Sequence, residues 1–334
     1  MISNHSIPLV FVETGRRPSR YLVNNLNIVR NRFPNRKIIL ILSKAYLSEI
    51  HVPGIEKVAE EDIIKNSMLL KFESIQKNWS GLQKNYWTNT TKRFFILGMY
   101  MDQYQLDQAV HLESDSILLS DKWLNKEFQK IDWGIKYPKQ HDSYGCASIF
   151  IINNLETLNR FLEFILQNWS RGEITDMNLL GEFVEIEKNA SFLPSSNLIS
   201  SSSTHIYDAV SIGYFFLGSD ARNQRLPFSA RGRRDMSAGA MALDKPEIRL
   251  NSQGVLLYKD TGTPEMELVN IHMHSKRIPR RYKALEKMIL RDSRGRSKFF
   301  WRLGAFDKLV FAERLTSFLN RRILRKKHFE FRLR

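Results

Sequence analysis

Short segments that are apolar on both faces, separated by stretches of helical periodicity, constrain the fold of this chain more than any other feature. Residues 7–15 (IPLVFVETG) and 37–43 (KIILILS) are two such segments, and between them Leu22, Leu26 and Val29 recur at helical spacing. Strands without a polar face are typical of a parallel sheet covered by helices on both sides. We therefore predict an α/β fold with one open, mostly parallel sheet flanked by helices.

The same alternation continues along the chain. Residues 91–107 and 156–169 have a helical period, whereas 108–119 and 144–154 are strand-like. A chain of 334 residues with 43% hydrophobic side chains can bury a core of the size that such a sheet requires.

Basic residues are concentrated at the C-terminal end. Residues 276–334 hold 20 Lys and Arg against 5 Asp and Glu, which leaves 31 basic and 30 acidic side chains for residues 1–275. The net charge of +16 therefore belongs to an appendage and not to the main body. We predict one large domain over residues 1–280 and a basic helical region over residues 281–334.

Within residues 290–334, apolar side chains recur at helical intervals between arginines and lysines. A basic amphipathic helix of this kind can lie on an anionic membrane surface, or it can pack on the body with its basic face in water. Both possibilities stay open. The apolar positions are Phe299, Leu303, Phe306, Val310, Phe318 and Leu319.

The single cysteine, Cys146, excludes an internal disulfide and suits a reducing compartment. The first thirty residues lack the basic-then-apolar pattern of a secretory signal, and no uncharged run reaches the length of a membrane span. We expect a cytoplasmic protein, with a peripheral position on the inner face of the membrane if the basic tail binds lipid.

Two acids interrupt the apolar stretch 108–119. Residues i and i+2 of a strand point to the same side, so Glu113 and Asp115 should project together. Two adjacent carboxylates repel each other, and a hard cation such as Mg²⁺ or Mn²⁺ between them would remove the repulsion. The alternative is a strand end whose acids are merely solvated, and for such a pair alone it is the better explanation.

The acidic pair in this context resembles the metal-binding element of nucleotide-sugar-dependent glycosyltransferases of the GT-A fold. The resemblance implies that Glu113 and Asp115 hold Mn²⁺ or Mg²⁺ against a nucleotide diphosphate, with Ser114 between them facing the donor. Glu113 stands where the family has aspartate. The segment 269–279 (VNIHMHSKRIP) resembles the late segment that completes the metal shell, which implies His272 and His274 as ligands and Lys276 as a diphosphate contact.

Three further segments resemble donor-binding parts of the same fold. The first strand and turn resemble the place of the base and ribose, and residues 87–97 (WTNTTKRFFIL) resemble the helix that offers a basic residue. The segment 144–154 resembles a strand whose small residues line the donor sugar. The implied donor-binding residues are Thr14, Gly15, Arg17, Lys92, Arg93, Ala147 and Ser148.

Candidates for a catalytic base are Asp176 and Asp208, with Glu182 ranked lower. Asp176 could instead cap a helix, with Thr175 competing for that role. In pattern the chain is similar to bacterial surface-polysaccharide transferases with a late His and Lys. It differs from them by Cys146-Ala147-Ser148 in place of Asn-Ala-Gly and by Asp176-Met177 in place of Asp-Gln.

The resemblance implies a metal-dependent glycosyltransferase that moves a hexose from a nucleotide-sugar donor to a glycan or lipid-linked acceptor in cell-surface polysaccharide or lipopolysaccharide synthesis. We expect no nucleic-acid partner. A nucleic-acid-binding protein that uses the basic tail is the alternative, and a degenerate transferase fold serving as a scaffold is a third possibility.

Overall fold

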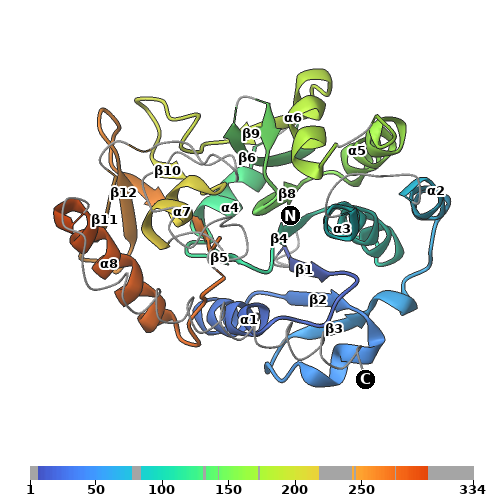
Figure 1. The fold of residues 1–334 in the computed structure, drawn as a ribbon, viewed down its shortest axis with the longest axis horizontal. Helices are drawn as coiled ribbons and strands as arrows, with labels where there is room; N and C mark the ends of the chain where they lie inside the picture. The colour runs from blue at the N-terminus through green and yellow to red at the C-terminus, as the bar shows by residue number, and fades with distance from the viewer. Residues whose placement is uncertain are drawn as a thin grey trace, which may run out of the picture.

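A computed structural model gives the fold of the chain (Figure 1). The side chains of Lys84 and of residues 291–299 are outside the description. The structure describes residues 7–76, 84–130, 133–141, 143–171, 174–217, 243, 246–274 and 276–299.

The centre of the molecule is an eight-stranded sheet of order β3-β2-β1-β4-β8-β6-β7, with β9 beside β6. Strands β1 to β4 run parallel, and β9 is parallel to β6, whereas β8 is antiparallel to both of its neighbours. The predicted α/β class and the mostly parallel sheet are confirmed. The strands are β1 (Leu9–Glu13), β2 (Ile38–Leu42), β3 (Glu56–Ala59), β4 (Ala109–Leu112), β6 (Ile135–His141), β7 (Tyr144–Gly145), β8 (Ile149–Ile152) and β9 (Ala190–Leu193).

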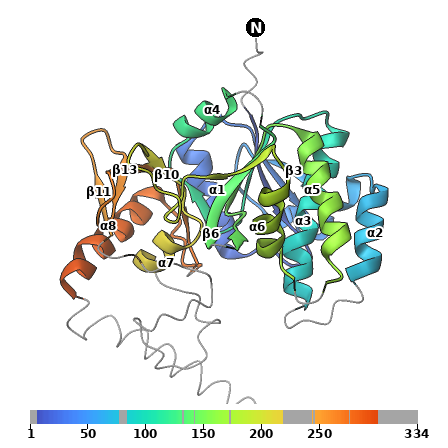
Figure 2. The ribbon, with the colours of Figure 1, turned by 90° about the horizontal axis from the view of Figure 1, so that it is seen from above.

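Helices cover both faces of this sheet (Figures 1 and 2). Successive residues of β1 point to opposite faces, so that Val10 packs in one core cluster and Phe11 in the other. The helices packed against the Val10 face are α2 (Ser67–Ile75), α3 (Lys84–Gln103), α5 (Leu155–Asn168) and α6 (Asp176–Ile186). The opposite face packs against α1 (Arg20–Arg32) and α4 (Lys122–Phe128).

The first helix forms where the spacing predicts it. Ser19 is its N-cap and accepts a hydrogen bond from the backbone N–H of Leu22. Leu22, Leu26 and Val29 are fully buried against the sheet. The apolar stripe therefore faces the core as an amphipathic helix requires.

A second layer of strands joins the central sheet at the site described below. It consists of a four-stranded sheet of order β10-β13-β12-β11 and a separate antiparallel pair, β14 with β5. Helices α7 (Ser211–Leu217) and α8 (Tyr282–Phe299) pack on these strands. The strands are β5 (Ser116–Leu118), β10 (His205–Ile206), β11 (Glu247–Leu250), β12 (Leu256–Lys259), β13 (Met266–Leu268) and β14 (Asn270–His272).

Two predicted strands are each broken by a turn. The stretch 108–119 divides into β4 and β5, and 144–154 divides into β7 and β8. Residues 113–115 form the first turn and residues 146–148 the second, and the backbone groups of a turn can bond locally. The backbone N–H of Ser116, for example, donates to the carbonyl of Glu113 at 2.9 Å.

Helix α8 begins inside the predicted basic appendage and packs on the rest of the chain. Leu285 and Ile289 are fully buried in the same cluster as Ile117 and Ile271. Residues 300–334 and the side chain of Phe299 lie outside the described residues, so the membrane and nucleic-acid predictions for the tail stay predictions. Among the described residues, no helix is both long enough and apolar enough to span a bilayer.

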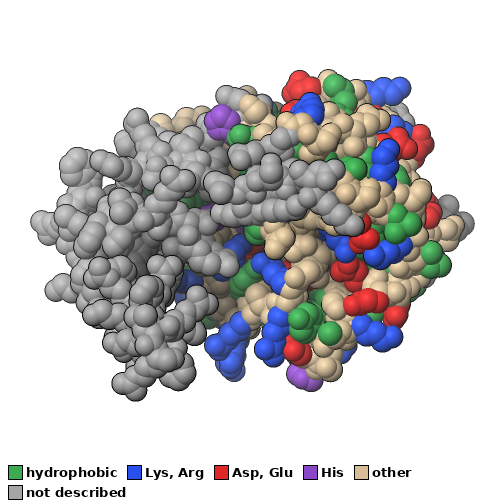
Figure 3. Space-filling model, turned by 45° about the vertical axis from the view of Figure 1, so that its right-hand side comes forward, with side chains coloured by type: hydrophobic (Ala, Val, Ile, Leu, Met, Phe, Trp, Pro, Cys, Tyr) green, Lys and Arg blue, Asp and Glu red, His purple; other side chains and the backbone are tan. Residues whose placement is uncertain are grey.

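Acidic and basic side chains are interspersed on the described surface of the face that carries α2 (Figure 3). This mixture agrees with the near-zero net charge of residues 1–275.

Candidate functional site

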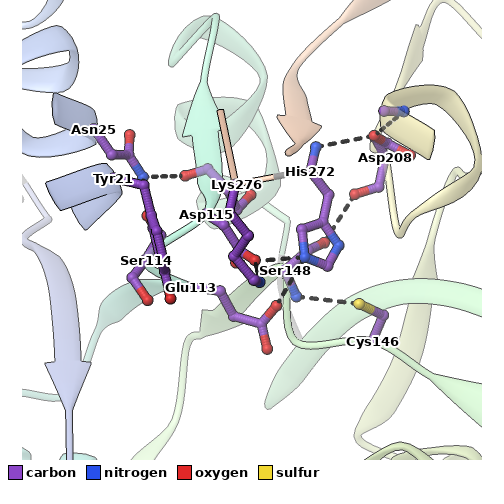
Figure 4. A network of polar contacts seen from close by, with 12 residues as sticks. Tyr21, Asn25, Glu113, Ser114, Asp115, Cys146, Ser148, Asp208, His272 and Lys276 are labelled. Carbon is purple, nitrogen blue, oxygen red and sulfur yellow. Dashed lines mark hydrogen bonds and ion pairs between the residues drawn. The ribbon is translucent and has the colours of Figure 1, made fainter. Parts of the chain in front are cut away.

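The acidic pair lies in a turn at the carboxyl edge of the sheet. Glu113 follows β4 directly, and β4 runs parallel to β1, so the turn stands where open α/β sheets collect their ligands. The prediction that Glu113 and Asp115 share one side of a strand is wrong, because both residues belong to the turn. The turn nevertheless directs both carboxylates toward His272 (Figure 4).

An asparagine of α1 holds this turn in place. The Asn25 side chain donates to the carbonyls of Ser114 at 3.1 Å and of Ser116 at 2.8 Å. Asn25 is not among the residues predicted for the site, although a polar residue on the helix face of Leu22 and Leu26 is a signal that the sequence contains. A polar residue on an apolar helix face must satisfy its hydrogen bonds inside the protein.

The second half of the site comes from β14, which pairs with β5 so that His272 lies opposite Ser116. His272 Nε2 lies 3.4 Å from Glu113 Oε2 and 3.4 Å from Asp115 Oδ1. The other ring nitrogen, Nδ1, contacts the carbonyl oxygen of Ala209. A carbonyl can only accept, so Nδ1 carries the proton, and in the neutral ring Nε2 presents a lone pair to the two carboxylates.

Three acceptor-type groups that face one another require a cation. In the protein alone a proton can serve: burial by itself would lower the pKa of His272, but the Asp115 carboxylate beside the ring holds this pKa well above its ordinary value. A divalent metal is the other solution, and the ring is oriented for it, because a ligating histidine commonly donates its second N–H to a carbonyl. One ligand atom each from Glu113, Cys146 and His272 lie within 4.8 Å of one another. These residues fit a divalent cation.

Lys276 and Arg93 supply positive charge on either side of the acids. The Lys276 ammonium pairs with Asp115 Oδ2, and Arg93 Nη2 lies 2.6 Å from Glu113 Oε1. Burial alone would raise the pKa of both carboxyl groups, yet Arg93 holds the pKa of Glu113 below its ordinary value, and Lys276 holds that of Asp115 well below. The structure thus brings two of the predicted donor contacts, Arg93 and Lys276, to the two predicted acidic metal ligands.

Asp176 also reaches this cluster. Arg93 Nη2 donates to Asp176 Oδ2 at 3.0 Å. Thr175 caps α6 in a reciprocal capping box with Asn178, so the Asp176 carboxylate is not required as the N-cap. Burial raises the pKa of Asp176 to about 6 even though the guanidinium is adjacent.

Asp208 is buried and saturated with backbone donors. Its carboxylate accepts from the N–H groups of Ile212 at 3.0 Å, Gly213 at 2.8 Å and His272 at 2.9 Å. These bonds join the start of α7 to the end of β14. The geometry therefore favours a positioning role for Asp208 and leaves Asp176 as the better candidate for a catalytic base.

Lys92, the other lysine predicted to bind the donor, forms ion pairs with acids outside the candidate site. Lys92 Nζ lies 2.8 Å from Glu60, which follows β3 directly, and 3.2 Å from Glu73 of α2. Adjacent helix residues point about 100° apart, so Lys92 and its neighbour Arg93 meet different partners.

The predicted base and ribose residues lie in the turn between β1 and α1. Thr14 Oγ1 donates to the carbonyl of Asn89 at 2.9 Å. A Cβ atom on Gly15, which has φ +67°, would lie 2.4 Å from Asn89 Nδ2. This turn is thereby held against α3. Arg17 is exposed and pairs with Glu49 at 2.8 Å.

Ala147 and Ser148 are buried in the turn between β7 and β8, where Ala147 packs in the core cluster of Val10 and Ser148 contacts the acidic turn. Ser148 Oγ donates to the carbonyl of Asp208 at 2.8 Å, and its own carbonyl accepts from the N–H of Glu113 at 3.3 Å. His274 lies beyond the end of β14, and its ring centroid is 6.0 Å from that of Tyr214 and 6.3 Å from that of His272. The strand alternation that predicted two inward-facing histidines ends at His272.

No family model matches the chain, and no curated protein matches it in sequence. Solved structures to which it is similar include PaToxG glycosyltransferase, at 10% identity and TM-score 0.38 over 54% of this chain and 68% of that one. Mouse xyloside xylosyltransferase 1 is similar at 12% identity and TM-score 0.40, over 57% of this chain and 85% of that one.

The galactosyltransferase LgtC, in complex with donor and acceptor sugar analogs, is similar at 15% identity and TM-score 0.38, over 64% of this chain and 79% of that one. All three structures are GT-A-type glycosyltransferases, the group that the sequence resembles.

Proposed function

We propose that this chain is a glycosyltransferase of the GT-A type that moves a sugar from a nucleotide-diphosphate donor to a hydroxyl group of a glycan or lipid-linked acceptor. The observation that carries the proposal is the position of His272 Nε2, which lies 3.4 Å from a carboxylate oxygen of both Glu113 and Asp115. Its second ring nitrogen is committed to the Ala209 carbonyl. This arrangement is the one expected of metal ligands at the carboxyl edge of an open α/β sheet.

Glu113, Asp115 and His272 would hold Mn²⁺ or Mg²⁺, with His274 as a further predicted ligand. When bound, the ion supplies Lewis-acid stabilisation of the charge that develops on the leaving diphosphate. The chain's own contribution to the same charge is Lys276, an ammonium that can pair with phosphate oxygens in place of Asp115.

Proton removal from the acceptor hydroxyl falls to Asp176 in this proposal. Its carboxylate is buried next to Arg93, and its pKa of about 6 lies near neutral pH, where a general base is most effective. Arg93 links this carboxylate to Glu113, so the position of the base depends on the same guanidinium as the acidic turn.

We place the reaction in bacterial surface-polysaccharide or lipopolysaccharide synthesis, at the cytoplasmic side of the membrane. The support for this finer statement is the sequence resemblance, together with the basic residues 290–334, which suit an anionic lipid surface.

The first test measures direct binding of Mn²⁺ by electron paramagnetic resonance. The second is a thermal-shift screen of nucleotide sugars with Mn²⁺ present. A ligand that binds only the native state raises the melting temperature by mass action. Asp115→Asn should lose at least about tenfold in Mn²⁺ affinity, whereas Glu182→Gln should not, because Glu182 is half-exposed and pairs with Arg171.

Equal Mn²⁺ binding by wild type and Asp115→Asn, with both folded by circular dichroism, would contradict the proposal. Salt-dependent retention on DNA without any shift from a nucleotide sugar would instead favour the nucleic-acid alternative.

A further inference from the structure

A thiol lies among the carboxylate and imidazole groups of the site (Figure 4). Cys146 is buried in the connection between β7 and β8, and its Sγ lies within 4.8 Å of a ligand atom of Glu113 and one of His272. Donors bound to one tetrahedral ion at about 2.0–2.3 Å are themselves roughly 3.5 Å apart. For all three residues to bind one ion, their ligand atoms would have to move closer together by about 1 Å, which side-chain rotation can supply.

The same backbone carbonyl, that of Ala209, orients both the thiol and the imidazole. Cys146 Sγ donates to the carbonyl of Ala209 at 3.2 Å, and His272 Nδ1 contacts the same oxygen. The backbone N–H of Ser148 donates to Sγ at 3.4 Å, a bond that would stabilise negative charge on sulfur. The backbone N–H of Cys146 is bonded to the carbonyl of Pro138 at 3.0 Å, which holds the residue in this position.

We propose that Cys146 is a protein ligand of this metal site, and that its sulfur makes the site select Co²⁺ and Zn²⁺ over Mg²⁺. The inference rests on the metal site of the proposed function. It adds a sulfur ligand to that site, which the acidic pair 113 and 115 alone would not lead one to expect. Thiolate suits softer ions, imidazole suits both kinds, and a site of carboxylates and water alone suits Mg²⁺.

Binding is a simple exchange at sulfur. The S–H bond breaks, a sulfur–metal bond forms, and the thiol proton passes to solvent with no change of oxidation state. His272 keeps its bond to Ala209, so that carbonyl still has a donor after the thiol proton leaves.

The competing explanation is an inert core cysteine, whose thiol is satisfied by Ala209. Because the chain has a single cysteine, spectroscopy can separate the two explanations without ambiguity. A thiolate-to-cobalt charge-transfer band in the near-ultraviolet can come only from Cys146, while the visible bands of bound Co²⁺ report binding whether or not sulfur is a ligand.

The experiment is a titration of the full chain with Co²⁺, followed in both spectral regions, and repeated with Cys146→Ser and His272→Gln. We expect wild type to show both sets of bands. Cys146→Ser should keep the visible bands and lose the charge-transfer band, with Zn²⁺ affinity lowered at least about tenfold and Mg²⁺ affinity changed less than about threefold. His272→Gln should weaken the binding of Co²⁺.

Visible bands without a charge-transfer band in wild type would overturn the role of Cys146 and leave the proposed metal site standing. No Co²⁺ or Mn²⁺ binding at all would overturn the metal site itself. The wild-type spectrum decides the role of sulfur even if Cys146→Ser fails to fold.

Discussion

The Lys276 ammonium forms an ion pair with the Asp115 carboxylate. Lys276, predicted to bind the donor diphosphate, therefore neutralises Asp115, predicted to bind metal. Lys276 has φ +58°, in the left-handed region that is uncommon for residues other than glycine. Backbone strain of this kind is typical of functional sites. In the proposed site, a metal ion and the lysine would therefore compete for the Asp115 carboxylate.

Replacement of Lys276 by methionine should therefore tighten Mn²⁺ binding in the absence of nucleotide. Loss of a competing cation beside a buried carboxylate should raise the affinity by about tenfold, or about 1.4 kcal/mol. The same variant should bind a nucleotide diphosphate more weakly. Titration of Mn²⁺ by paramagnetic resonance, with and without nucleotide, measures both effects.

The matched control is Lys92→Met, which removes the same charge next to Glu60 and Glu73. It should leave Mn²⁺ affinity unchanged. Weaker Mn²⁺ binding by Lys276→Met would show that the lysine positions Asp115 for the metal and does not compete with it.

The neighbours Lys92 and Arg93 should differ in what their substitution costs. Lys92→Met breaks a partly buried pair and should lower the free energy of unfolding by about 1–3 kcal/mol while the folded protein keeps its transferase rate. Arg93→Lys keeps the charge but not the planar fork that joins Glu113 and Asp176, and transfer should fall at least about tenfold.

Urea unfolding and a donor-hydrolysis assay distinguish the two variants. If Lys92→Met loses more activity than its unfolded fraction explains, Lys92 does contact the donor, as the sequence predicted, and the purely structural role is wrong.

The rate of transfer should rise with pH through about pH 6. Asp176 can accept a proton only when ionised, and burial raises its pKa to about 6, so below that pH the group is protonated and inactive. Asp176→Asn should remove this limb of the profile and lower the rate by about 10²–10⁴-fold. Glu182 is an acid of the same helix that pairs with Arg171, and Glu182→Gln should keep the wild-type profile.

Gly213 should be intolerant of even a methyl group. A Cβ atom there would lie 1.9 Å from the backbone oxygen of His272, so α7 or the end of β14 would have to move. Gly213→Ala should cost about 1–3 kcal/mol or more in urea unfolding and should weaken metal binding through His272.

Gly254→Ala is the control for backbone effects. Its Cβ would meet nothing within 4 Å, although φ is +76°, so only the left-handed backbone costs free energy, about 1–2 kcal/mol. Metal affinity should be unchanged. An equal loss of metal affinity in both glycine variants would contradict a specific effect on His272.

Acid stability should depend in part on Glu127. Its burial alone would raise the pKa, but hydrogen bonds from Lys130 and Lys136 hold the pKa below its ordinary value of 4.5. The folded state therefore binds this proton less readily than the unfolded state, and the stabilisation is present above about pH 4.5 and is lost as the pH falls through the lower folded value. Glu127→Gln should flatten this part of the stability curve, measured by urea unfolding from pH 3 to pH 7.

The α/β class and most of the elements that build it could be predicted from the order of residues alone. The strands β1 and β2 and the helices α1 and α5 stand where periodicity predicts them, because burial of a stripe depends on residues only a few positions apart. The acids of the 113–115 turn were also visible as charges within an apolar stretch.

Which of the candidate residues contact one another depends on the packing of the folded chain. Lys92 and Arg93 are equivalent by type and position, yet one contacts Glu60 and the other Glu113, according to what each side of α3 packs against. His272 lies close to the acids because β14 pairs with β5. Cys146 lies close to Glu113 and His272 because the chain turns between β7 and β8. Contacts between segments so far apart in the chain follow from how the whole core is buried, which no local period encodes.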